Sequence, residues 1–231
     1  AALTQQWAQH ADAVQAPESI LLETNQQAQA WWQQACESAD ARLDWVLKPA
    51  YSRFANRACI RPAVARQIPI QVQAGQPWLA QRFIAGREYC SYSVLQHGRL
   101  VAHSCYHPKY RGGQGSGIWF EPQQPQAVRQ FVERFGAQTG YHGQVAFDYI
   151  EDVCGRFFVL ECNPRATSGV HLFAQQAREL VQVTVQGGDL LLCDTAPAQV
   201  ALAMWLFAAP KHGWRKQFWR DYRAARDVIT R

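Results

Sequence analysis

Short runs of alternating apolar and polar residues recur along the chain and predict β-strands. They lie at Ser19 to Thr24, Asp44 to Lys48, Cys59 to Pro62, Trp78 to Ile84, Glu88 to Leu95, Leu100 to Tyr106, Gln144 to Ile150 and Phe157 to Asn163. The dipeptide His97-Gly98 separates two of these runs and predicts a hairpin.

Longer segments between the strands have the composition and periodicity of helices. We expect helices over residues 1–17, from an N-cap at Asn25 to about Ser38, from about Pro125 to Gly136, from about Val170 to Val183, and over Val200 to Phe207. Hairpins and helices mix without regular strand–helix alternation, so the pattern predicts an α+β fold and not a doubly wound parallel sheet. Arg111 to Gly117 (RGGQGSG) has too much glycine for one regular conformation and predicts a mobile loop.

The composition is that of a globular protein. The chain has 231 residues, of which 48% are hydrophobic and 12% aromatic, enough to bury one sizeable core or two small ones that share a cleft. The longest apolar run, Val200 to Ala209, stops at Pro210 and is much shorter than the roughly 20 residues of a membrane-spanning helix. The first residues show neither a secretory signal nor an initiating methionine, so we expect a trimmed part of a longer, cytoplasmic protein.

The cysteines are odd in number, lack CxxC spacing and mostly lie in apolar runs, which predicts reduced, buried thiols. His103, Cys105 and His107 alternate along one predicted strand and would share a face. No second pair of ligands accompanies them, so the sequence argues against a zinc site.

The net charge of +5 is carried by the segment from Lys211 to the end, and the rest of the chain is neutral. A neutral body argues against a broad nucleic-acid surface. The basic segment also has an apolar stripe at helical spacing, formed by Trp214, Phe218, Tyr222, Ala225 and Ile229. This pattern favours a surface helix docked on the body or on another domain, and RNA or membrane binding is the alternative.

The strongest chemical signal is QVAFDYIEDVCGRFFVLECNPRATSG, residues 144–169. If Val153 to Arg156 form a hairpin loop, Asp148 lies opposite Glu161 with Cβ atoms about 5 Å apart, and Asn163 points to the same face. Carboxylates side by side among apolar residues repel and lose hydration, unless a proton or a cation relieves them. Two carboxylate oxygens and an amide oxygen, completed by phosphate oxygens, suit Mg²⁺.

The residues after this strand indicate an anion next to the metal. Pro164 ends the strand, Arg165 can reach an anion, and Thr167-Ser168-Gly169 opens a predicted helix whose free N–H groups attract anions. Metal, arginine and helix end would converge on a phosphate or carboxylate. The alternative places Asp148 on the solvent face of an ordinary hairpin, with Glu161 paired to Arg165.

This segment resembles the closing motif of ATP-grasp enzymes, the superfamily of D-alanine ligases, biotin carboxylases and carbamoyl-phosphate synthases. The resemblance implies that Asp148, Glu161 and Asn163 hold Mg²⁺ (or Mn²⁺) bridging the ATP phosphates. It also implies that Arg165 contacts the reacting phosphoryl and acyl groups. Lys48 in WVLKPA resembles the lysine that contacts the nucleotide phosphates. The similarity covers about residues 17–185, with the motifs in the expected order.

The segment WLAQRFIAGRE resembles the hinge between the two lobes of these enzymes. It implies that the backbone at Phe83 and Ile84 meets adenine and that Glu88 binds the ribose hydroxyls. Gln81 stands where an acidic residue is common, which changes the expected adenine contact. Without the resemblance, Lys48 would be interpreted as an edge-strand charge and Glu88 as a surface residue.

The sequence departs from the family pattern in the segment after the lysine strand. A glycine-rich loop is usual there, whereas this chain has YSRFANR. Arg53 and Arg57 would supply guanidinium contacts in place of backbone donors. RGGQGSG is either the mobile cover of the phosphates or a plain flexible connection. The family's preceding domain and its first nucleotide lysine are absent from this sequence.

We therefore expect an ATP-grasp fold with two α+β lobes and the nucleotide between them. The small lobe would span residues 1–84, the large lobe with the metal site 85–195, and a helical extension 196–231. The resemblance implies an ADP-forming ligase that activates a carboxylate as an acyl phosphate for attack by an amine, a thiol or another nucleophile. The alternative is an ATP-binding regulatory module without turnover. Expected partners are small-molecule carboxylate and nucleophile substrates; a preceding domain or a homodimer is left open, and neither membrane nor nucleic acid is expected.

Overall fold

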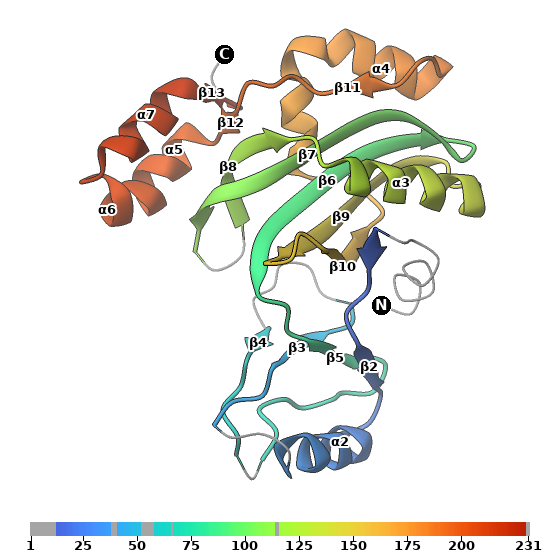
Figure 1. The fold of residues 1–231 in the computed structure, drawn as a ribbon, viewed down its shortest axis with the longest axis vertical. Coiled ribbons are helices and arrows are strands. Elements are labelled where there is room, and N and C mark those ends of the chain that lie inside the picture. Colours follow the sequence, from blue (N-terminus) through green and yellow to red (C-terminus); the bar gives the residue numbers. More distant parts are fainter. Residues whose placement is uncertain (1–12, 38–40, 52–57, 66, 114–115, 230–231) are drawn as a thin grey trace.

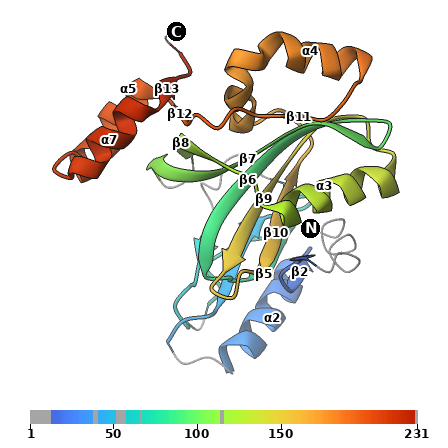
Figure 2. The same ribbon diagram turned by 45° about the horizontal axis from the view of Figure 1, so that its top comes forward.

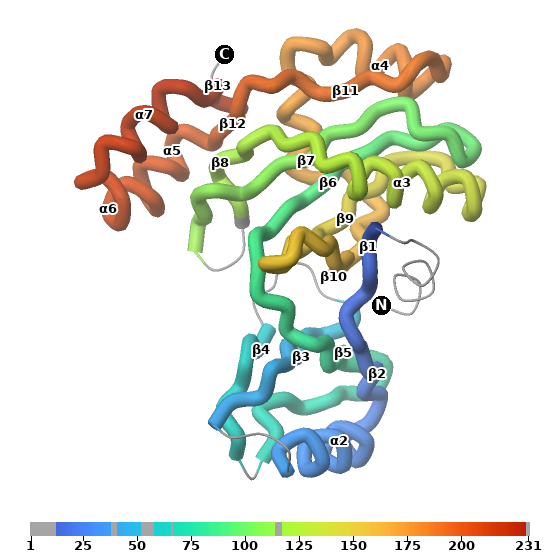
Figure 3. Tube along the Cα trace, viewed as in Figure 1, coloured from blue at the N-terminus to red at the C-terminus, as the bar shows by residue number. Residues whose placement is uncertain are grey.

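Two β-sheets, one large and one small, form the two lobes of the molecule (Figure 1). The computed structural model describes residues 13–37, 41–51, 58–65, 67–113 and 116–229. The small lobe lies at the bottom of Figure 1, and the carboxyl-terminal helices extend from one edge of the large sheet. Figure 3 follows the chain from β1 beside the large sheet, through the small lobe, and back into the large lobe.

The strands of the small sheet are β2 (Ser19–Leu22), β3 (Trp45–Pro49), β4 (Cys59–Ile60) and β5 (Trp78–Arg82). Those of the large sheet are β1 (Val14–Gln15), β6 (Gly86–Gln96), β7 (Arg99–Gly112), β8 (Ser116–Gln123), β9 (Gly143–Asp152), β10 (Phe157–Asn163), β11 (Leu191–Leu192), β12 (Ala198–Gln199) and β13 (Arg226–Asp227). The described helices are α2 (Asn25–Glu37), α3 (Gln126–Thr139), the 3-10 helix η1 (Ser168–Gln176), α4 (Ala177–Gln186), α5 (Ala201–Ala203), the π-helix η2 (Met204–Ala208), α6 (Ala209–His212) and α7 (Lys216–Ala224).

The large sheet has the strand order β1-β10-β9-β6-β7-β8-β12-β13, with β11 paired to β7. Its central strands, β10, β9, β6, β7 and β8, are antiparallel to one another. Successive residues of a strand point to opposite faces. Helix α3 covers one face, where Phe131 packs with Phe147. Helix η1, followed by α4, covers the other, where Phe173 packs with Tyr92. In Figure 2 strands β6 and β7 run between α3 and α4.

The small sheet, in the order β2-β5-β3-β4, is covered by α2, whose Trp32 is fully buried in its core. The start of α2 differs from the prediction. The hydroxyl of Thr24, and not Asn25, accepts a hydrogen bond from the backbone N–H of Gln27, at 3.1 Å. The amide of Asn25 instead exchanges two hydrogen bonds with the backbone of Val72, at 2.9 and 2.8 Å. A tertiary contact therefore outweighs the local preference of asparagine for the cap.

Two segments of chain join the lobes. The chain leaves the large sheet after β1, enters the small sheet at β2, and returns through residues 83–85 between β5 and β6. The return segment lies within the sequence that predicts a hinge. Strand β1 pairs in parallel with β10, although it lies within the expected small lobe of residues 1–84. The exact division of the chain into lobes stays a prediction.

Two predictions of local structure are wrong. The predicted amino-terminal helix falls mostly on residues 1–12, outside the described part, but Val14 and Gln15 form a strand because they pair with the edge of β10. In the segment RGGQGSG, residues 114–115 lie outside the described part, but Arg111 and Gly112 belong to β7, and Ser116 and Gly117 to β8, which pairs with it. Glycine at position 117 serves close packing, because a Cβ atom there would lie 2.8 Å from the Cβ of Pro108.

The helices after the large sheet also differ in detail from the prediction. The segment predicted as one helix from Val170 is a 3-10 helix up to Gln176 and an α-helix afterwards. The predicted final apolar helix continues past Pro210 to His212, because Pro210 occupies the first turn of α6, where proline is tolerated. Of the helices in the described part of the chain, none is long and apolar enough to cross a membrane.

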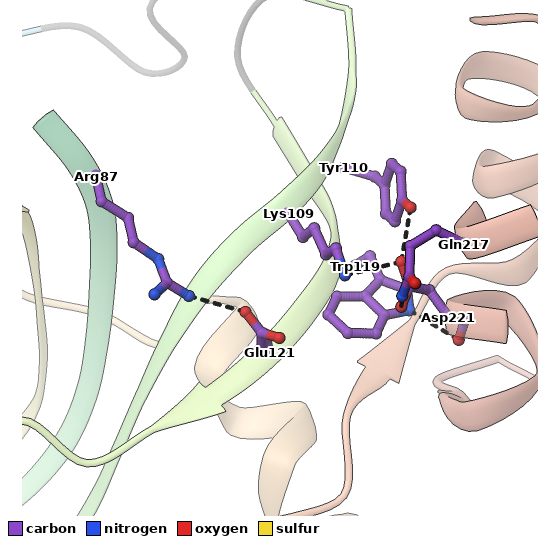
Figure 4. Close-up of polar contacts among 7 residues, drawn as sticks. All are labelled: Arg87, Lys109, Tyr110, Trp119, Glu121, Gln217 and Asp221. Atoms are coloured by element: carbon purple, nitrogen blue, oxygen red, sulfur yellow. Dashed lines mark hydrogen bonds and ion pairs between the residues drawn. The ribbon is translucent and has the colours of Figure 1, made fainter. Parts of the chain in front are cut away.

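Helix α7 is docked on the large lobe, as one of the two predictions for the basic segment expects. Phe218 is buried with residues of β7 and β8. Asp221 forms an ion pair with Lys109 at 2.8 Å and accepts hydrogen bonds from Tyr110 at 2.7 Å and Gln217 at 2.8 Å (Figure 4). Two members of the predicted stripe, Trp214 and Ile229, are instead exposed.

Candidate functional site

Asp148 on β9 and Glu161 on β10 lie opposite each other, as the sequence predicts. The register is reached in an unexpected way. The pairing that runs from the turn to Val159, continued without interruption, would place Leu160 opposite Asp148. A β-bulge between Val159 and Glu161 shifts the register by one residue and brings the two carboxylates together.

The carboxylate pair is electrostatically unfavourable in the absence of a ligand. Asp148 points to the face of the sheet away from α3, because its neighbours Phe147 and Tyr149 both pack on the α3 side. Loss of hydration raises the pKa of Asp148. Loss of hydration and the charge of Asp148 together raise the pKa of Glu161. A bound cation would relieve both effects.

Lys48 and Gln81 reach this site from the small lobe. The backbone carbonyl of Leu160, in the bulge, accepts hydrogen bonds from Lys48 Nζ at 3.3 Å and from Gln81 Nε2 at 3.4 Å. Burial lowers the pKa of Lys48, while the charges of Glu161 and Asp148 act in the opposite direction. The structure therefore brings the predicted phosphate-binding lysine and the predicted metal ligands to one place.

Asn163 and Arg165 extend the site along the chain after Glu161. Asn163 Nδ2 donates to Asp148 Oδ2 at 3.4 Å, and Arg165 Nη2 donates to Asn163 Oδ1 at 3.4 Å. The exposed guanidinium of Arg165 also donates to the carbonyl of Ala166 at 3.1 Å. Its positive charge is one of the influences that oppose the raised pKa of both carboxylates.

Two further residues lie at the site: Cys90, which had no predicted role, and Arg111, which the sequence placed only in the glycine-rich segment RGGQGSG. Cys90 lies directly across from Asp148 on β6, and its side chain opposes the rise in the pKa of that carboxylate. Arg111 forms an ion pair with Glu88, the predicted ribose ligand. Burial lowers the pKa of Arg111 and the charge of Asp148 opposes this, so its guanidinium faces the same site. Cys90 and Arg111 could have been identified from the strand order β9, β6, β7. A single sequence does not reveal that order.

The remaining predicted contacts lie at the edge of the site or outside the described residues. Phe83 and Ile84 are half-buried in the connection between β5 and β6, and the backbone N–H of Phe83 donates to the carbonyl of Asp44 at 2.9 Å. Arg53 and Arg57 lie outside the described residues. Across the described ranges, no three or more His, Cys, Asp or Glu side chains gather as a possible metal site. A cation here would therefore depend on amide and substrate oxygens besides the two carboxylates.

Comparisons with known proteins give matches of structure alone. No family model and no curated protein matches the sequence. N5-carboxyaminoimidazole synthetase from Staphylococcus aureus matches with a TM-score of 0.59 and 10% identity, over 92% of this chain and 59% of that one. Its complex with ADP matches with a TM-score of 0.55 and 9% identity, over 92% and 58%. Phosphoribosylamine–glycine ligase from Thermotoga maritima matches with a TM-score of 0.55 and 13% identity, over 79% and 53%.

These matches and the two-lobed arrangement identify the fold. The chain has the ATP-grasp fold that its sequence predicts and shares it with this synthetase and this ligase. It spans between 53% and 59% of the length of the matched structures. At 9–13% identity the similarity is one of fold.

Proposed function

We propose that the chain binds ATP with Mg²⁺ between its lobes and, as part of an ADP-forming ligase, passes the γ-phosphate to a carboxylate substrate. The observation that carries this proposal is the pairing of Asp148 with Glu161, with Lys48 reaching the same place from the other lobe. The names of the matched structures, a synthetase solved with ADP and an amine ligase, give further support.

The residues at the site fit a magnesium ion. Asp148, Glu161 and Asn163 would hold it through oxygen atoms, which Mg²⁺ and Mn²⁺ both accept, and phosphate oxygens would fill the other positions. The raised pKa of each carboxylate is the expected sign of a pair that lacks its cation. When bound, the ion would neutralise charge on the phosphates.

The side chains around the carboxylates would bind and orient the substrates. Lys48 would contact the phosphates, and Arg165 would hold the carboxylate beside the transferring phosphoryl group. A substrate carboxylate oxygen attacks the γ-phosphorus, the bond to ADP breaks, and an acyl phosphate forms. An amine or thiol then attacks the acyl carbon and phosphate leaves. No side-chain nucleophile is needed.

The nucleoside would lie against the connection between the lobes. Gln81 and the backbone at Phe83 and Ile84 would contact adenine, and Glu88 would bind the ribose hydroxyls. Glu88 is already paired with Arg111, so ribose binding would share or replace that ion pair. Arg111 would then be released toward the phosphates near Asp148.

Calorimetric titration of ATP with and without Mg²⁺ tests the proposal. We expect Mg²⁺-dependent binding that Glu161→Gln weakens at least about 10-fold. Glu179→Gln, on the exposed surface of α4, is the matched control and should bind as the unchanged chain does. A folded chain with no affinity for ATP would contradict the proposal. Tight binding without ADP release for any carboxylate and amine would favour the regulatory module.

A further inference from the structure

A cavity lies where strand β7 exchanges one neighbouring strand for another. β8 pairs with β7 as far as Cys105, whereas β11 pairs with β7 at Ala102 and His103. Between these two neighbours is a cavity of about 100 Å³, whose wall is completed by Gln126 and Arg129 of α3.

This cavity is separate from the carboxylate site. Cys105, which lines it, packs in the core beneath α3 together with Phe147. His103 is two residues away on the same strand and therefore shares that face. Asp148 lies on the other face of the sheet, so the two sites have the sheet between them.

His103 contributes a buried polar atom without a partner. The residue is 5% exposed, and its Nδ1 lies 2.9 Å from the hydroxyl oxygen of Ser93. Its Nε2 has no hydrogen-bond partner among the described residues. Burial and the charge of Arg129 lower the pKa of His103 to about 4, so the ring is neutral near pH 7. In the tautomer whose Nδ1 accepts from the Ser93 hydroxyl, the ring proton is on Nε2, which is then a donor at the cavity.

Helix α3 and Arg129 add positive potential at the same place. The helix has 14 residues and begins at the cavity, where Pro125 provides no side-chain cap and the first turn contains no acidic residue. The N–H groups of such a turn are partly positive and lack intrahelical partners. Arg129 also lines the cavity; its Nε forms a partly exposed ion pair with Glu133 Oε1 at 3.6 Å and makes no hydrogen bond among the described residues.

The opposite wall contains no negative charge to repel an anion. Cys105 and Cys193 both line the cavity. Burial raises the pKa of the Cys105 thiol well above its usual value and that of Cys193 to about 11. Both thiols are therefore neutral near pH 7 and form a compact, weakly polar wall.

We propose that this cavity is a binding site for a small oxyanion, a phosphate or a short carboxylate. The Nε2–H of His103, the guanidinium of Arg129 and the first turn of α3 hold its oxygens, and the thiols limit its size. The site is independent of nucleotide binding, because it lies across the sheet from Asp148.

An NMR titration of the His103 ring in the whole chain, without Mg²⁺ or ATP, tests the site. Inorganic phosphate, acetate and bicarbonate are added separately, with chloride as the ionic-strength control. We expect a saturable change of the Nε2 resonance with at least one of them, and the tightest-binding one identifies the source of the oxyanion. Arg129→Gln should weaken binding at least about 10-fold. Arg134→Gln, on the same helix but not lining the cavity, should not.

The titration of the unchanged chain tests anion binding at the cavity even if the Arg129 variant does not fold. No saturable change of the His103 resonance with any of the three anions would mean that the cavity holds water alone. If Arg129→Gln and Arg134→Gln lost the same anion affinity, binding would depend only on the net charge of the chain. That result would also overturn the proposal. Asp148→Asn should leave anion binding unchanged, which separates this test from that of the nucleotide site.

Discussion

The carboxylate of Asp221 and the carboxylates of Asp148 and Glu161 differ in the partners that the fold provides, and their pKa values shift in opposite directions. Asp221 is 6% exposed and has an ion pair with Lys109 and hydrogen bonds from Tyr110 and Gln217. Burial alone would raise its pKa, but the hydrogen bonds from these three residues hold the pKa below its usual value. The charge of Asp221 is thus satisfied within the chain, and its role is to fix α7 on the sheet.

The Asp148–Glu161 pair, in the site between the lobes, is compensated less completely, although Asp148 accepts a hydrogen bond from Asn163 at 3.4 Å. Among the described residues, no ion pair within 4.0 Å involves Asp148 or Glu161. Lys48 of the small lobe donates its hydrogen bond to a backbone carbonyl instead. The pKa of both carboxylates is raised. A structural carboxylate is paired with charged and hydrogen-bonding groups of its own chain. A carboxylate that binds a cation lacks such an ion pair until the cation is present.

The largest effect should come from removing the compensated carboxylate. Asp221→Ala deletes the acceptor of an ion pair and two hydrogen bonds and leaves Lys109 partly buried without a counter-charge. We expect the free energy of unfolding to fall by about 2–3 kcal/mol. Urea denaturation measures it, with the exposed Asp189→Ala as the control. Equal stability of the two variants would mean that α7 is held by its apolar contacts alone.

Removing the ammonium group of Lys48 should weaken ATP binding without lowering the free energy of unfolding. Lys48→Met keeps the length of the side chain but removes an ammonium group that burial destabilises. We expect ATP affinity to fall about 10- to 100-fold while the free energy of unfolding stays the same or rises. Calorimetry and urea denaturation measure the two quantities, with Lys211→Met as the exposed control. Unchanged ATP affinity would exclude Lys48 from phosphate binding.

The smallest effect concerns the pH dependence of stability without Mg²⁺. The folded pKa of Glu161 lies above its usual value of 4.5, so the folded state binds the proton more tightly than the unfolded state does. The wild type therefore loses stability as the pH rises from 4.5 through the raised pKa. Glu161→Gln avoids this loss and should become the more stable chain over that window. We expect less than about 0.5 kcal/mol, because solvent screens an exposed carboxylate.

Urea denaturation of both chains at a series of pH values measures this difference. Glu179→Gln, whose carboxylate is exposed on α4, should show no such gain. If the advantage of Glu161→Gln did not change with pH, the two carboxylates would not be coupled. The comparison with Asp221 would then rest on geometry alone.

Much of the fold and the centre of the site could be predicted because their signals are local. Alternation along Gln144 to Ile150 and Phe157 to Asn163 identifies two strands, and the short segment between them requires a hairpin. That hairpin places Asp148 and Glu161 on neighbouring strands, and the bulge brings them directly opposite each other. The bulge at Leu160 had no such signal, since its reason lies in the small lobe, where Lys48 and Gln81 bind its carbonyl.

What the sequence did not reveal depends on contacts between distant segments. Arg111 reaches the site only because β7 lies two strands from β9, with β6 between them. Asn25 leaves its expected cap because Val72, 47 positions further on, binds its amide. The strand at Val14 and Gln15 forms because the edge of β10 is available to them. In each case local propensity was outweighed by a partner that only the folded chain supplies.

The two connections between the lobes have a mechanical consequence. A body tied to another by one strand can swing and twist freely, whereas a body tied by two strands turns easily only about the line through both attachments. The small lobe is tied in this second way, at residues 16–18 and 83–85. Rotation of the small lobe about that line would move Lys48 relative to Asp148 and Glu161, and it would break the hydrogen bond from Lys48 to the Leu160 carbonyl.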